Sequence, residues 1–340
     1  MLSSPLPTRT AWIAHWQTLE LPVLQYTLEQ MHALHGKSDD IGLKDLAALI
    51  EHDALLTLRV IRFLQENRHV SQITDVSTVD RVLLMIGVEG FFKEFATSEA
   101  LEARLNDFPS AREGLRRVMA RHYFAARLAC AIADQRHDLD PLEVKTASLL
   151  SGLAEMLLWL SAPQLATTIM RNQLQQPALR SRDAQIAVIG LPLIELQLEL
   201  AARWHLPELL THLMDEKRAD EPRVRTVSVA TALARHLATG WHNAALPDDY
   251  RMVADLLSCS LDDAYRLVLR CAINSGHQWQ WFHCLPPISQ RPLDATPPPQ
   301  TQDGGEAAAA TSDATPDGMP AAVTPPGDEP SSGTPPATAK

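Results

Sequence analysis

Apolar residues recur three and four positions apart through most of the chain, and this spacing restricts the fold more than any other feature. Between Ala47 and Ile61 the apolar positions fall on one side of a helix with about 3.6 residues per turn. Asp53 stands directly before the run that starts at Ala54, where a side-chain N-cap is expected. The spacing predicts helices that each bury one face.

The same spacing predicts further helices over residues 112–134, 142–160, 164–173, 182–204, 224–239 and 248–257. Only Val224–Val229 is also compatible with a short strand, and the apolar positions after it return to helical spacing. No repeat with a period of about 20 to 50 residues is visible, which argues against a solenoid. We therefore expect residues 12–284 to form an all-α, compact multi-helix bundle.

The composition changes sharply after Cys284. Residues 285–340 contain 13 of the 24 prolines and no aromatic residue, with Ala, Thr, Gly and Asp between the prolines. Such a segment cannot bury enough apolar surface to offset the entropy of the chain. We expect a disordered, Pro/Ala/Thr-rich C-terminal tail. Its proline runs could bind a partner as polyproline II helices, but a linker-like role is the simpler expectation.

Charge and hydropathy restrict the class of protein. The formal net charge of -11 argues against general nucleic-acid binding, which needs a basic surface to neutralise phosphates. No apolar core of an export signal follows Met1. The longest apolar run, 147–162, contains Glu155 and is shorter than the roughly 20 residues that span a bilayer. The four cysteines form no CxxC pair. We expect a cytoplasmic protein without membrane contact.

Short motifs follow one another through the first two thirds of the chain. Residues 46–55 read LAALIEHDAL, residues 73–87 run from Ile to Ile-Gly, and residues 204–208 read WHLPE. Between them, Arg121-His122-Tyr123 opens a long apolar helix, and Leu149-Leu150 leads into Ser-Gly.

In this order the segments resemble the HDOD family, a bacterial branch related to the HD-domain phosphohydrolases. The corresponding family motifs are LA-x-x-I-x-x-DPxL, I-x-S followed by A-x-x-LG, HS, LLHDIG and W-x-LP-E. Ala54 stands where the family has proline. The resemblance implies an HD-like helical bundle. We expect an N-terminal lead-in (1–19), an HDOD-like domain (20–222), a C-terminal helical extension packed on it (223–284) and the tail (285–340).

The resemblance also implies that the metal site has been lost. HD hydrolases hold a divalent ion with several convergent imidazoles and a His-Asp pair, which activates water. At the matching positions, His and Asp are replaced by Ser151 and Gly152, and a later His is replaced by Leu193. A family His-His pair falls near Lys217-Arg218, whose charges repel a metal. Of the matching ligand positions only His122 keeps its residue, so we expect no metal, no cofactor and no enzymatic activity.

Arginines at four positions of one predicted helix form the densest positive run. Their spacing predicts a broad basic face, which could contact an anion, a nucleotide phosphate or a partner. The competing interpretation is a solvated helix surface with Glu113 and Asp107 as partners. The four residues are Arg112, Arg116, Arg117 and Arg121. A second basic stretch, from Lys217 to Arg225, is interleaved with acidic residues and resembles an exposed loop.

Three other features are interpreted structurally. The dipeptide His137-Asp138 lies in a polar loop, about fourteen residues before the family's position, and we interpret it as coincidence. His122 is expected to be a hydrogen-bonded histidine rather than a ligand. The aromatic run 279–282 either anchors the last helix or docks a partner.

The resemblance implies a non-catalytic signalling protein that acts on unidentified partner proteins in a bacterial pathway, with a possible link to cyclic dinucleotides. Two alternatives stay open. One is a divergent metal-dependent phosphohydrolase that uses His122 with His205 or His212. The other is a nucleotide receptor that uses the arginine face.

Overall fold

A computed structural model describes residues 1–36, 42–67, 76–176 and 178–284. The predicted tail, residues 285–340, lies outside the described residues. All described residues belong to one compact unit. Within them the extended pairing is limited to an isolated bridge between Val23 and Ala100. The prediction of an all-α fold is therefore confirmed.

The described helices are α1 (Arg9–Gln17), α2 (Gln25–His35), α3 (Leu43–Ile50), α4 (Ala54–Glu66), α5 (Val79–Phe95), α6 (Leu101–Arg104), α7 (Pro109–Gln135), α8 (Pro141–Leu150), α9 (Leu153–Ser161), α10 (Pro163–Gln175), α11 (Ser181–Ile189), α12 (Leu193–Arg203), α13 (Glu208–Leu213), the 3-10 helix η1 (Glu216–Arg218), α14 (Pro222–Leu237), α15 (Leu246–Leu257), α16 (Leu261–Gly276) and α17 (Trp279–Phe282).

Two predicted helices are each divided in two, and this part of the prediction is wrong. The predicted helix 182–204 is interrupted at Gly190, which caps α11 with a positive φ of 82° that glycine adopts without strain. The predicted helix 142–160 is interrupted at Ser151-Gly152, between α8 and α9. The candidate strand Val224–Val229 lies within α14, as the apolar spacing after it indicates.

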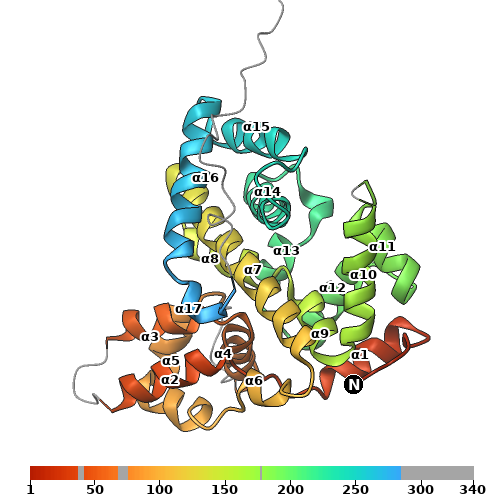
Figure 1. Ribbon diagram of the computed structural model, residues 1–340. Coiled ribbons are helices and arrows are strands. Elements are labelled where there is room, and N and C mark those ends of the chain that lie inside the picture. Colours follow the sequence, from red (N-terminus) through yellow and green to blue (C-terminus); the bar gives the residue numbers. More distant parts are fainter. Residues whose placement is uncertain (37–41, 68–75, 177, 285–340) are drawn as a thin grey trace, which may run out of the picture. The chain divides into compact units, whose positions relative to one another are not determined.

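Helix α7 is the central element of the bundle. It has 27 residues and contacts α8, α9, α14 and α16 along its length. In Figure 1 it runs between α2–α6 at one end and α14–α16 at the other. Small buried residues such as Ala125 and Ala129 let these neighbouring helices approach closely. One close approach is at Gly114, where an added Cβ would lie 2.4 Å from Cζ3 of Trp159 in α9.

The first helix is part of the packed body. Trp12 and Trp16 of α1 are fully buried, and α1 packs against α12. The indole Nε1 of Trp16 donates a hydrogen bond of 3.0 Å to Oγ of Ser161 at the end of α9. The lead-in segment therefore stabilises the contact between α9 and α12.

Asp53 joins the start of α4 to the segment before α2. Its Oδ1 accepts hydrogen bonds of 3.0 Å from the amides of Leu55 and Leu56, which is the predicted N-cap. Its Oδ2 accepts a bond of 2.7 Å from the amide of Leu24. The side chain is fully buried, and this burial raises its pKa to about 6 against the opposing effect of the amides.

Substitution Asp53→Ala is expected to lower the free energy of unfolding by about 2 kcal/mol, because it removes a helix cap and leaves the buried Leu24 amide without its partner. Urea denaturation followed by circular dichroism measures this loss. Thr8, which caps α1 at the surface, is the matched control, and Thr8→Ala should cost less than about 1 kcal/mol. Equal losses at both caps would contradict the linking role of Asp53.

The short α17 packs onto the N-terminal helices through aromatic rings. The ring of His52 is stacked between Tyr123, at 4.7 Å, and Trp281, at 4.2 Å between centroids. Tyr26 meets Trp281 edge-on at 4.9 Å. Trp281 and Phe282 are buried, so these two residues of the aromatic run anchor the helix; the side chain of Trp279 lies outside the described part.

No single helix in the described ranges is long and apolar enough to cross a membrane. Two combinations reach the required length and composition only when their parts are taken together: Pro141–Ser161 with α10, across a bend of 119°, and α11 with α12, across a bend of 79°.

Candidate functional site

The break between α8 and α9 brings Ser151 and Gly152 against His122 of α7. Gly152 has φ -98° and ψ 12°, which any residue can adopt, so the backbone itself does not require glycine here. The apolar spacing continues from α8 into α9, which explains why the sequence predicts one helix. We call His122, Ser148, Ser151, Gly152 and Thr231 the His122 site.

The imidazole of His122 is held inside the fold. Its Nδ1 lies 3.1 Å from Oγ of Ser151 and 3.3 Å from the carbonyl oxygen of Ser148. A carbonyl oxygen only accepts hydrogen bonds, so Nδ1 carries the proton in the Ser148 contact. The other nitrogen, Nε2, then faces Gly152.

Gly152 is needed because of its contact with His122. A Cβ at position 152 would lie 2.1 Å from Nε2 of His122 and 2.3 Å from its Cδ2. Both distances are far below a van der Waals contact, for which about 3.5 to 4.0 Å is usual between carbon atoms. The imidazole therefore occupies the space that an aspartate side chain at position 152 would need.

The hydroxyls of Ser151 and Thr231 complete the site. Ser151 Oγ donates to the carbonyl of Ser148 at 2.7 Å and lies 3.2 Å from Oγ1 of Thr231 in α14. Both residues line a cavity of about 40 Å³, together with Glu216 and mostly apolar side chains. A cavity of this size holds a few water molecules.

The amide at the start of α9 is also paired. The backbone N–H of Ala154 donates a hydrogen bond of 3.2 Å to Oε1 of Gln197, a buried residue of α12. Free amides at a helix start are common anion sites. Here a side chain of the protein occupies one of them.

His122 is uncharged at neutral pH. Burial, together with the positive charge of the adjacent Arg121, lowers its pKa to about 3. An imidazole in an unfolded chain binds a proton near pH 6.5. Between these two values the unfolded state holds a proton that the folded state does not, so this group makes the fold less stable as the pH falls.

This difference gives a pH prediction. The free energy of unfolding of the wild-type chain should fall by about 2 kcal/mol relative to that of His122→Gln between pH 6.5 and 5, because the variant lacks the titrating group. Urea denaturation of both chains at several pH values measures the difference. A difference that does not change with pH would show that His122 is not the buried neutral group.

The other positions aligned with family ligands lie on different elements. Leu193 is buried at the start of α12, and Lys217 and Arg218 are exposed on η1. His212 Nε2 lies 2.7 Å from Oε2 of Glu221, and His205 is exposed after α12. Over the described ranges, no three or more His, Cys, Asp or Glu side chains are grouped so that they could hold a metal ion.

The four arginines of α7 do not form one exposed face. Arg116 binds Glu102 at 2.7 Å and Arg121 binds Glu155 at 2.5 Å, and both arginine side chains are less than a fifth exposed. Arg117 binds Glu113 at 2.8 Å and is 64% exposed. The predicted broad basic face is thus wrong, since two of its charges are paired and largely covered. Arg112 is half-buried.

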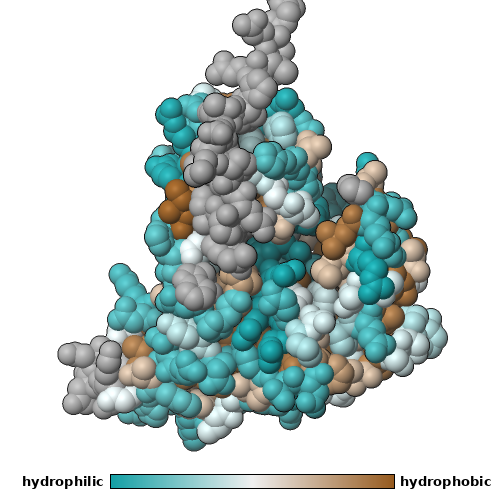
Figure 2. All heavy atoms as spheres, in the orientation of Figure 1, coloured by the Kyte–Doolittle hydropathy of each residue, from teal (hydrophilic) through white to brown (hydrophobic). Residues whose placement is uncertain are grey.

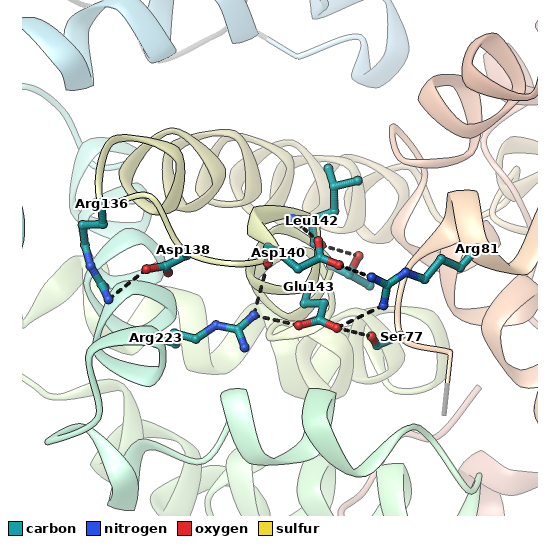
Figure 3. Close-up of polar contacts among 9 residues, drawn as sticks. Ser77, Arg81, Arg136, Asp138, Asp140, Leu142, Glu143 and Arg223 are labelled. Carbon is teal, nitrogen blue, oxygen red and sulfur yellow. Dashed lines mark hydrogen bonds and ion pairs between the residues drawn. The ribbon is translucent and has the colours of Figure 1, made fainter. Parts of the chain in front are cut away.

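The His137-Asp138 dipeptide belongs to the loop between α7 and α8. Asp138 forms an ion pair of 3.1 Å with Arg136. Figure 3 shows it beside a larger group of ionic contacts around Glu143, and this group holds the start of α14. Arg223 donates a hydrogen bond of 2.8 Å to Glu143. Because Arg223 belongs to α14, it lies in a helix rather than in the predicted exposed loop. Arg225 lies in the same helix.

Comparison with known proteins gives the family. The HDOD domain model matches residues 21–219, more than half of the chain. The chain belongs to the HDOD family. Its recognition from the short motifs is confirmed. A comparison with curated proteins found no match.

Two solved structures share the fold of this HDOD protein. The MmoQ response regulator of Methylococcus capsulatus is 20% identical, with a TM-score of 0.57, and the match covers 74% of this chain and 98% of the regulator. A virulence factor of Campylobacter jejuni is 16% identical, with a TM-score of 0.58, and the match covers 79% of this chain and all of that one. At these identities the likeness shows the fold alone.

Sequence reasoning missed Ser148 and Thr231 of the His122 site, and also Gln197 beside it. Thr231 lies on α14, beyond the residues that match the family, and Gln197 reaches the start of α9 from α12. Neither belongs to a motif. A buried glutamine in the middle of an apolar helix is a signal that could have indicated Gln197, because such a side chain must find a partner.

Proposed function

We propose that this HDOD protein is a non-catalytic signalling protein of the cytosol, which acts by binding other proteins. The observation that carries the proposal is the contact between His122 and Gly152. An HD hydrolase needs an aspartate at this position to hold its metal, and here the imidazole of His122 fills the space for that side chain. The fold that the chain shares with a response regulator supports a signalling role.

Metal analysis of the purified full-length chain tests the proposal. We expect substoichiometric Mn, Fe and Zn, and no hydrolysis of p-nitrophenyl phosphate, because the neutral imidazole of His122 is directed at a backbone position rather than at an open site. Stoichiometric metal that is lost in His122→Ala but kept in His242→Ala would overturn the proposal. That result would favour the divergent phosphohydrolase, with His242 as the exposed control position outside its candidate ligands.

The nucleotide alternative has its own test. A link to cyclic-dinucleotide signalling is part of what the family resemblance suggests, and the most exposed of the four arginines of the predicted basic face is Arg117. Calorimetric titration of the full chain with cyclic dinucleotides and (p)ppGpp is expected to give no heat of binding. Saturable heat that is lost in Arg117→Gln, with the fold intact by circular dichroism, would replace the protein-binding proposal by a nucleotide receptor.

A further inference from the structure

A second cavity lies away from the His122 site. It is a groove of about 540 Å³ between the end of α1 with the segment that follows it, one side of α4, and the end of α5 with the segment that follows it. Gln17 and Leu21 belong to the first of these walls, Phe63 to the second and Ser98 to the third. Three separate parts of the chain therefore surround it.

The positive charges of this groove are used within the fold. Arg59 donates from Nη1 to the carbonyl of Leu21 at 3.2 Å and to Oγ of Ser98 at 2.8 Å, and its guanidinium lies over the ring of Phe95. Arg62 lies over the ring of Trp204 at 4.3 Å. These two cations are held against aromatic rings and backbone rather than presented to solvent.

The negative charges stand at the surface. Glu20, Glu66 and Glu99 line the groove with side chains that are 87%, 55% and 46% exposed. Their arginine partners are covered: Arg62 is 20% exposed, and Arg104, which binds Glu20 and Glu99, is 23% exposed. Glu94 also lines the groove and is exposed.

A molecule that approaches from solvent thus meets carboxylates first and apolar side chains behind them. Phe63 and Leu19 are partly buried residues that line the groove, and Phe95 is buried beneath them. The carboxylates come from all three walls, so they are distributed around the groove rather than gathered at one point. This arrangement matches a chain that carries several positive charges with apolar side chains between them better than a compact cation.

We propose that this groove, which we call the Glu20 groove, docks a lysine- or arginine-containing segment of a partner protein that also inserts apolar side chains. The proposal rests on the proposed function, since it names the class of partner. The net charge of -11 on the chain increases the rate at which such a positive segment associates.

Fluorescence anisotropy with the full-length chain tests the proposal. The probe is a fluorescein-labelled peptide in which lysines are interspersed with leucine and serine. One comparison peptide has serine at every leucine, and another has glutamate at every lysine. We expect saturable binding of the lysine-leucine peptide, binding weaker by about tenfold without leucine, and none of the acidic peptide.

Charge reversal locates the binding surface. Glu20→Lys with Glu94→Lys should weaken binding of the lysine-leucine peptide at least about tenfold. The control is Glu89→Lys with Asp255→Lys, which changes the net charge equally at exposed positions outside the groove. The control should weaken binding less than about threefold. Circular dichroism verifies that both double variants are folded.

Three results would overturn the proposal: no saturable binding, equal weakening in both double variants, or equal affinity for the peptide without leucine. Displacement by free spermidine with no contribution from leucine would instead assign the groove to a small organic cation. None of these outcomes bears on the metal content of the chain, so failure here is distinct from failure of the non-catalytic assignment.

Discussion

Replacing Gly152 by alanine is expected to lower the free energy of unfolding by more than about 3 kcal/mol, the upper range for overpacking a core. The new Cβ would lie 2.1 Å from Nε2 of His122, and this imidazole is buried and hydrogen bonded on its other side. The ring cannot turn away without breaking the contacts of its own Nδ1 with Ser148 and Ser151 inside the fold. Urea denaturation followed by circular dichroism measures the loss.

A double-mutant cycle assigns the loss to this contact. His122→Ala removes the ring, so Gly152→Ala should cost much less in that background, and the coupling energy should exceed about 2 kcal/mol. Gly90 of α5 is the matched control, since a Cβ there meets only the Cβ of Ile86 at 3.7 Å. Gly90→Ala should be neutral or stabilising by up to about 1 kcal/mol. Additive losses in the cycle would contradict the contact.

The same reasoning bears on function. Introducing His and Asp at positions 151 and 152 would restore the family's dipeptide in the sequence but not a metal site, because the aspartate would need the volume of the His122 ring. Under the proposed function, the replacement of the ligands and the position of His122 are thus coupled. A metal site that includes position 152 would require at least two changes in contact with each other.

The second large loss of stability is expected from a substitution at the crossing of α7 and α9. An alanine at Gly114 would place its Cβ 2.4 to 2.6 Å from three ring atoms of Trp159, which is 4% exposed. We expect Gly114→Ala to lower the free energy of unfolding by about 3 kcal/mol, because the indole is enclosed and the two helices must separate. Thermal and urea denaturation report the loss.

Shortening the partner side chain should restore part of this stability. Trp159→Leu alone is expected to cost about 2 to 4 kcal/mol through the cavity it leaves, and adding Gly114→Ala to it should cost little more. If Gly114→Ala were as costly in the Trp159→Leu background as in the wild type, the cause would lie in the conformation of α7 rather than in the crossing.

The helices could be predicted from the sequence because their apolar stripes repeat locally. The cap at Asp53 follows from one residue and its neighbours in the chain. The break at Ser151-Gly152 could not be predicted in this way, since the apolar spacing continues across it. Glycine is needed there because of a ring on α7, which is about thirty residues away in sequence.

The arginines of α7 also show that local sequence patterns do not predict contacts between distant parts of the chain. Sequence proximity suggested Glu113 as a partner, and it does pair with Arg117. The partner of Arg121 is Glu155, which is 34 residues away and reaches it only because α9 folds back against α7. Local patterns therefore give the number of charges on a helix. Tertiary contacts decide which of these charges reach solvent.

The stacking of Trp281 on His52 has a consequence for synthesis of the protein. The two residues are separated by 229 positions, and Gln280 also contacts Tyr26 across 254. At about 5 to 20 residues per second, a ribosome needs roughly 10 to 50 s to add the intervening chain. During that interval the rings of His52 and Tyr26 lack their last covering helix. The nascent N-terminal half thus exposes an aromatic surface to chaperones until α17 has been made.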